Sequence, residues 1–139
     1  MDYDQDIVDA LDATTSLTKG TDLFMGAVRG FSNLIPYKCV FVTASGGGPT
    51  RPIKAGLSGV GIQERHASAQ IRIRSDAEAV SGSFSVGQSL AREVFDALHF
   101  KPVAGYCEWR AVSSAPLYIG QNEEGQHEWS INLDVIFDI

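Results

Sequence analysis

The sequence has few basic residues, few cysteines and no long apolar run. Its 139 residues include 11 Lys and Arg against 17 Asp and Glu, which gives a formal net charge of −6. Nucleic-acid binders neutralise phosphates with clustered Lys and Arg, whereas the basic residues here are scattered, so we expect no specific DNA or RNA binding. No run approaches the ~20 apolar residues of a membrane span, and no secretory signal pattern is present. We therefore expect no membrane partner and synthesis in a cytoplasm.

Cys39 and Cys107 are the only cysteines, and they lie far apart in the sequence. Each belongs to an apolar, strand-like run, where a free thiol behaves as a small hydrophobic side chain. This usage favours two reduced core cysteines in a cytosolic protein over a disulfide.

The groupings that catalysis and cofactor binding need are also missing. His66, His99 and His127 do not have metal-ligand spacing, and His99 is placed to cap carbonyls at the end of a predicted helix. The glycines in 46–61 lack the Gly-Lys-Ser/Thr ending of a phosphate-binding loop. We expect a protein that is not an enzyme, with no catalytic residue, no cofactor and no metal.

A packed core is nevertheless expected, because apolar residues make up 44% of the chain and charged residues 20%. The length fits one domain over residues 1–139, with neither repeats nor a linker. The N-terminal part predicts a helix with Ile7, Val8 and Leu11 on its apolar face and a stop at Lys19-Gly20. Residues 21–30 show no clean periodicity.

The middle of the chain predicts a strand, a long loop, a second strand and a helix. Residues 37–43 form a β-branched and aromatic run, and 69–74 alternate between apolar and polar residues. The Gly- and Pro-rich loop between them, 46–61, is long enough to be functional. Residues 86–98 carry the clearest helical pattern, preceded by Ser85 and Gln88 in the spacing of a capping box and closed by Pro102.

The last third predicts strands only. Residues 107–112 alternate, residues 117–119 form a short strand, and 120–125 form a hairpin turn. The final strand places alternate apolar side chains on one face: Trp129, Ile131, Leu133, Val135, Phe137 and Ile139. Ile136 breaks this pattern. The predicted fold is α+β, a mostly antiparallel sheet with two main helices packed on one face.

Five segments carry a resemblance to a known family. They are 20–24 (GTDLF), 69–75 (AQIRIRS), 94–99 (VFDALH), 113–123 (SSAPLYIGQNE) and 125–133 (GQHEWSINL). In this order the chain resembles the tail-terminator and minor-capsid proteins of long-tailed, siphovirus-like bacteriophages. One departure is Gln121, where the family pattern leads us to expect a charged residue.

The resemblance implies a structural protein of the virion, assembled in the host cytoplasm, with a tail-terminator-like fold. It implies a homohexameric ring that caps the head-proximal end of the tail tube and stops its polymerisation. The partners would be the tail tube protein and a neck or head-completion protein. DNA would pass through the ring without specific binding, and the net negative charge of the chain is consistent with this because it repels phosphates.

Two elements are predicted to contact partners: the 46–61 loop and the 120–128 hairpin. The side chains best able to make these contacts are Arg51, Lys54, Glu123, Glu124 and His127. Arg72 and Arg74 share one face of a strand, where they would pair with carboxylates of the neighbouring strand or of an adjacent subunit.

Two alternatives remain open. The first is a head-completion or neck adaptor of the same kind of phage, which is also small, acidic and ring-forming. The second belongs to another class: a small-molecule binding or hydrolytic α+β domain with a pocket beneath the 46–61 loop.

Overall fold

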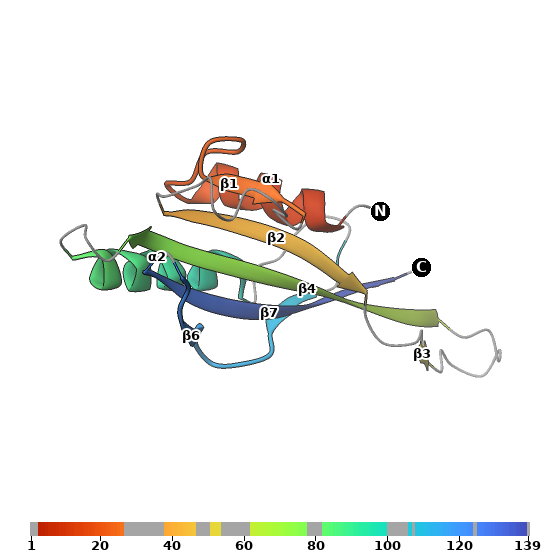
Figure 1. Cartoon of the computed structure of the whole chain (residues 1–139). Coiled ribbons are helices and arrows are strands. Elements are labelled where there is room, and N and C mark those ends of the chain that lie inside the picture. Colours follow the sequence, from red (N-terminus) through yellow and green to blue (C-terminus); the bar gives the residue numbers. More distant parts are fainter. Residues whose placement is uncertain are drawn as a thin grey trace.

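The computed structural model of the protein describes residues 3–26, 38–46, 51–53, 62–77, 82–99, 106, 108–123 and 125–138. Side chains are not described at 45–46, 51–53, 62–65 and 137–138. Figure 1 shows two helices behind a twisted sheet whose longest strands, β4 and β7, cross its centre. In chain order the elements are α1 (Tyr3–Thr14), β1 (Leu23–Met25), β2 (Cys39–Gly46), β3 (Arg51–Ile53), β4 (Ile62–Ala77), α2 (Ser83–Leu98), β5 (Glu108–Ala111), β6 (Leu117–Gln121) and β7 (Gln126–Asp138).

The strands form one sheet with the order β1-β2-β4-β7-β5. Strand β3 also pairs with β4, and β6 also pairs with β7. Only β1 and β2 run parallel, and the other described pairs are antiparallel. The prediction of an α+β fold is therefore confirmed, with a mixed sheet that is mostly antiparallel.

The register of the central strands directs their apolar side chains to the helices. Ile71 lies opposite Ile131 and Ile73 lies opposite Trp129, and all four side chains are buried. Helix α1 packs on β1 and β2, and α2 packs on β4, β7 and β5, while the two helices also touch each other. Successive strand residues point to opposite faces of a sheet, so these alternate apolar side chains share one face. The two helices together cover that face.

The first helix is shorter than predicted. It ends at Thr14, whose hydroxyl donates to the Ala10 carbonyl, whereas the predicted stop was Lys19-Gly20. Lys19 instead forms an isolated parallel bridge with Leu23, and Gly20 adopts a φ of 86°. This turn leads into β1, a strand that the sequence pattern did not reveal because it is only three residues long.

The predicted loop at 46–61 contains a strand. Strand β3 pairs with the start of β4, so that Arg51 lies opposite Glu64. Strand β4 begins at Ile62, well before the predicted start at residue 69. Residues 47–50 and 54–61 lie outside the described residues, as do Cys107 and Pro102.

The second helix is confirmed, but its start differs from the prediction. The N-cap is Gly82, in a left-handed conformation and without a side-chain cap, so the predicted capping box at Ser85 and Gln88 is wrong. Val86 begins the predicted helical pattern at 86–98, yet its side chain is 43% exposed. Gly87 takes the buried position, one residue further on. In the described part of the chain, neither helix has the length and hydropathy of a membrane span.

The C-terminal strands follow the prediction closely. Strands β6 and β7 form the predicted hairpin, in which Gln121 lies opposite His127. Trp129, Leu133 and Val135 are buried on the helix side. Ile136 interrupts the alternation as predicted and is also buried, while Ile139 and the side chain of Phe137 lie outside the described residues.

Replacement of Gly87 by Ala tests the contact between α2 and the sheet. An added Cβ would lie 2.7 Å from Cζ3 of Trp129 and 2.8 Å from Cβ of Ser75. The helical preference for Ala gains about 1 kcal/mol, but overpacking costs about 1–3 kcal/mol. Because the ring is held in the core, we expect the cost to exceed the gain, so that Gly87→Ala lowers the free energy of unfolding by up to about 2 kcal/mol.

Urea denaturation measures this change, with Ser89→Ala on the exposed side of the same helix as the control. A Gly87→Ala variant that is as stable as the control would show that α2 packs less tightly on Trp129.

Candidate functional site

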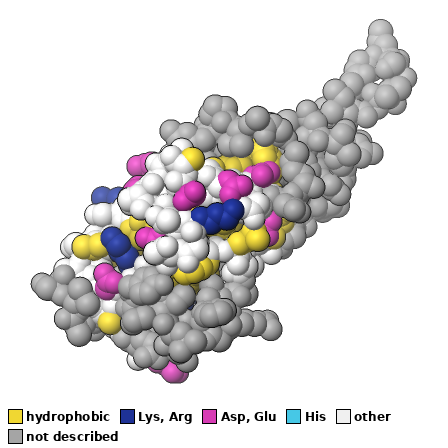
Figure 2. All heavy atoms as spheres, turned by 90° about the horizontal axis from the view of Figure 1, so that it is seen from above, with side chains coloured by type: hydrophobic (Ala, Val, Ile, Leu, Met, Phe, Trp, Pro, Cys, Tyr) yellow, Lys and Arg dark blue, Asp and Glu magenta, His cyan; other side chains and the backbone are white. Residues whose placement is uncertain are grey.

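The described surface carries both signs of charge. Figure 2 shows acidic and basic side chains interspersed with apolar ones on the face seen from above, without a large patch of either sign among the coloured atoms. No three His, Cys, Asp or Glu side chains come together to hold a metal ion in the part of the chain that the structure describes. The face in Figure 2 thus shows no basic platform for phosphates, and the described residues offer no metal centre.

Cys39 is free and fully buried in β2. Burial raises the pKa of its thiol to about 11, and the positive charge of Arg74 only partly opposes this shift. Since the thiolate is the nucleophilic form, this thiol stays protonated and inert at neutral pH. The predicted reduced core cysteine is confirmed at this position.

The three histidines lie in different parts of the fold. His66 is half-buried on β4, opposite Ile136 of β7. His99 follows α2, and its Nδ1 accepts the backbone N–H of Ala111 at 3.1 Å, a different contact from the predicted carbonyl cap. His127 lies on β7, in the aromatic cluster described below.

Arg72 and Arg74 lie on the sheet face opposite the helices. The Nη2 atom of Arg74 lies 2.8 Å from Oε1 of Glu128, and its Nε donates to the same oxygen at 3.0 Å. Arg72 lies further from this carboxylate, at 3.9 Å. The Arg74 guanidinium also lies over the ring of Phe41, 5.4 Å from its centroid. Of the two predicted pairings, the one with the neighbouring strand is therefore present.

The other predicted contact residues are only partly described. Glu123 is exposed in the turn between β6 and β7, and His127 is half-buried just beyond it. The backbone of Arg51 belongs to β3, but its side chain is not described. Lys54 and Glu124 lie outside the described residues. The structure thus brings Glu123 and His127 together on one hairpin.

The hairpin is anchored to a bulge in β4. The Ser75 hydroxyl accepts the backbone N–H of His127 at 2.9 Å, and the Ser75 carbonyl accepts the Gln126 amide at 3.1 Å. Asn122 holds the other side of the turn, because its Oδ1 accepts the backbone N–H of Gln126 at 3.0 Å. Since Gln126 and Ser75 are fully buried, these bonds fix the hairpin against the body of the protein.

Four rings form an aromatic cluster at the start of α2: Phe84, Tyr118, His127 and Trp129. Phe84 lies 5.0–5.5 Å from the other three ring centroids. The Tyr118 hydroxyl is 2.8 Å from Nδ1 of His127. Trp129 is buried, but Phe84 is 41% exposed and Tyr118 is 49% exposed. This cluster therefore presents aromatic surface to solvent.

Strand β6 presents further apolar surface beside the aromatic cluster. Leu117, Tyr118 and Ile119 are 50%, 49% and 48% exposed. Among the described strands β6 pairs only with β7, so within the described part of the chain no strand lies along its other edge. An apolar edge strand of this kind is a template for pairing with another chain.

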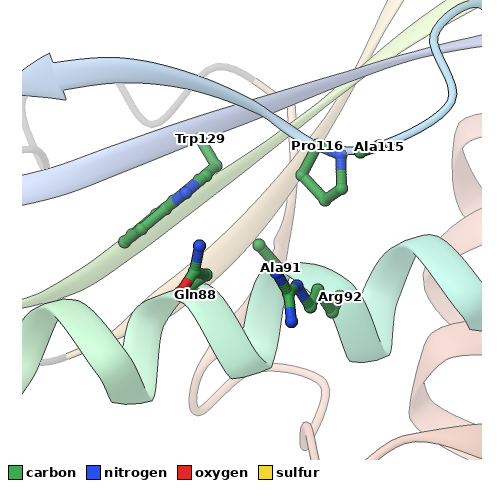
Figure 3. A pocket seen from close by; sticks show the side chains of 6 residues that line it. All are labelled: Gln88, Ala91, Arg92, Ala115, Pro116 and Trp129. Atoms are coloured by element: carbon green, nitrogen blue, oxygen red, sulfur yellow. The ribbon is translucent and has the colours of Figure 1, made fainter.

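A hollow of about 190 Å³ separates α2 from the segment that enters β6. Its lining, shown in Figure 3, comprises Gln88, Ala91, Arg92, Ala115, Pro116 and Trp129. In Figure 3 the Trp129 ring and Pro116 lie above α2. They face Gln88 and Ala91 of the helix across the hollow. We call this feature the α2–β6 hollow; it adjoins the aromatic cluster through Trp129.

The sequence prediction found the hairpin but missed the apolar part of this site. Tyr118 and Trp129 were assigned to strands, and Phe84 was not assigned at all. The available signal was the spacing of Phe84, Gln88 and Arg92, four residues apart, which places them along one side of a helix. That spacing does not reveal which element the side faces. Comparison of the chain with models of known protein families and with curated proteins gave no match.

Replacement of Glu128 by Gln tests the buried ion pair. The change leaves the Arg74 guanidinium buried without its counter-charge, which typically costs about 3–5 kcal/mol. We expect Glu128→Gln to lower the free energy of unfolding by this amount, measured by urea denaturation at pH 7.

The double variant Arg74→Met with Glu128→Leu removes both charges and is expected to be less destabilised than Glu128→Gln alone. If the single and double variants lost the same stability, the cost would come from packing and not from the unpaired charge.

Proposed function

We propose that this protein is a structural assembly subunit of a long-tailed bacteriophage, the ring-forming tail terminator that caps the head-proximal end of the tail tube and joins it to the neck. The observation that carries the proposal is strand β6, an edge strand with three large, half-exposed apolar side chains. In a lone subunit this edge would invite aggregation, and in a ring each copy covers it.

The surroundings of β6 support a contact with a second protein surface. Tyr118 packs beside Phe84 on the helix side of the sheet, whereas Leu117 lies opposite Ser130 and points to the other face, so β6 exposes apolar side chains on both faces. Exposed apolar side chains on an edge strand favour contact with another protein surface. The hairpin is also held rigidly by Ser75 and Gln126, so contact requires little ordering of the chain.

The assignment to a tail terminator, including a terminator-like fold, comes from the sequence resemblance. The α+β architecture is compatible with it: a mostly antiparallel sheet with two helices over one face. The net charge of −6 suits a ring through which DNA passes without sticking. In this proposal the partners are further copies of the chain in a hexamer, the tail tube protein and a neck protein.

The α2–β6 hollow, which is distinct from the predicted pocket beneath the 46–61 loop, is smaller than a typical ligand pocket. Ligand pockets usually enclose about 300–1,000 Å³. The hollow is smaller, at about 190 Å³, and is lined in part by Pro116, which precedes β6, and by Trp129. It is better suited to receive a side chain of a partner protein than to enclose a free ligand.

A double substitution on β6 tests the ring. Leu117→Lys with Ile119→Lys places two charges on the exposed edge, and charged residues on edge strands oppose pairing with another chain. We expect the wild-type protein to sediment as a ring in analytical ultracentrifugation and the double variant to sediment as a folded monomer.

Val112→Lys is the matched control, because Val112 is 67% exposed but precedes β6 and lies outside any strand. Circular dichroism checks that each variant is folded. A double variant with the wild-type subunit number would show that β6 is not in the interface.

Electron microscopy of a phage with a nonsense mutation in this gene tests the terminator role. Overlong, headless tails beside DNA-filled heads are expected, because nothing would stop tube polymerisation or permit joining. Tails of normal length beside emptied heads would instead identify a neck adaptor, and intact infectious particles would contradict a structural role in the phage.

A further inference from the structure

The side of α2 that borders the α2–β6 hollow has the character of a recognition surface. Phe84, Gln88 and Arg92 follow one another at intervals of four residues, so they form a row of about 12 Å along the helix. The row begins in the aromatic cluster and ends with a guanidinium group, and Trp129 lies opposite its centre. An apolar end and a cationic end thus belong to one continuous surface.

The polar groups of this row are not used within the described part of the chain. Arg92 is exposed and makes none of the ion pairs there, in contrast to Lys19, Arg74 and Arg110, which each lie within 4 Å of a carboxylate. The Gln88 amide likewise has no hydrogen bond among the described residues. A guanidinium presents a rigid set of donors that matches a carboxylate, and the amide beside it offers a further donor.

The shape of the hollow limits what it can receive. Its volume of about 190 Å³ is below the usual range for a bound small molecule. Ala91, Ala115 and Pro116 contribute small, apolar surfaces, and Trp129 contributes a large one. The occupant that fits is an apolar side chain with a carboxylate beside it.

A second copy of this chain supplies that chemistry. Each copy carries 17 Asp and Glu against 11 Lys and Arg, so a neighbouring copy has many carboxylates that could meet Arg92. We propose that the α2–β6 hollow receives an acidic side chain and its apolar neighbour from an adjacent copy, with Arg92 and Gln88 holding the carboxylate. The inference rests on the proposed ring and identifies where one copy recognises the next.

Charge reversal at Arg92 tests the inference. We expect Arg92→Glu to raise the concentration at which the assembly dissociates by about tenfold or more, measured by native mass spectrometry of the full-length protein. Arg110→Glu is the matched control: Arg110 is also exposed, but it lies on β5, and it should change the dissociation concentration by less than about twofold. Equal dissociation of Arg92→Glu and wild type would overturn the inference.

A photo-crosslinker at position 88 identifies the occupant. Gln88 is replaced by p-benzoylphenylalanine in assemblies mixed from light and ¹⁵N-labelled chains, and cross-linked peptides are mapped by mass spectrometry. A light–heavy crosslink to a peptide with Asp or Glu beside an apolar residue is expected. Crosslinks confined to a single chain, or a wild-type protein that stays monomeric at millimolar concentration, would overturn the inference.

These results separate the inference from the proposed function. If phage tails lose length control without the protein but the Arg92→Glu variant assembles normally, then only the proposed role of the α2–β6 hollow in contact between copies fails. If Arg92→Glu weakens an assembly whose loss leaves phage tails unchanged, the terminator role fails and the hollow assignment stands.

Discussion

The pairing of β4 with β7 is the constraint on which the other features of the molecule depend. Its register places Ile71 opposite Ile131 under the helices, and it places Arg74 opposite Glu128 on the other face. A shift by one residue would turn the apolar side chains of one strand away from the helices and separate the two charges. The core and the ion pair therefore favour the same register. Because β7 also carries β5 and β6 on its other edge, this register determines where the exposed hairpin lies.

The position of α2 explains why the helix side of β6 is left uncovered. The helix packs on β4, β7 and β5, and Gly87 allows it to approach Trp129 closely. Strand β6 lies beyond the helix, on the outer side of β7. Trp129 is consequently buried by α2 on one side and borders the α2–β6 hollow on the other. The hollow is thus a consequence of a two-helix layer on a sheet that is wider than the layer.

The sequence predicted the elements whose periodicity is long and regular. The alternation at 69–74, the helical pattern at 86–98 and the alternation from Trp129 to Val135 are all present in the structure. Strands β1 and β3 have three residues each, which is too short for an alternation of apolar and polar residues to be recognised. Each is a strand because it pairs with the edge of a longer one, β1 with β2 and β3 with β4. The capping box failed because Gly82, which needs no side-chain cap, begins the helix three residues earlier. The site was predicted only at its polar hairpin, since the contact of α2 with Trp129 is tertiary and leaves no local pattern.

The distribution of basic side chains connects the fold to assembly. Copies of a chain with a net charge of −6 repel one another, so an interface between them needs apolar contact and local cations. Lys19, Arg72, Arg74 and Arg110 each lie near a carboxylate of their own chain, and Arg74 is buried with its partner. Lys38 and Arg92 are the basic side chains without such a carboxylate in the part of the chain that the structure describes. Only Arg92 borders the apolar surface of Trp129 and Pro116, so its charge is available where copies would otherwise repel.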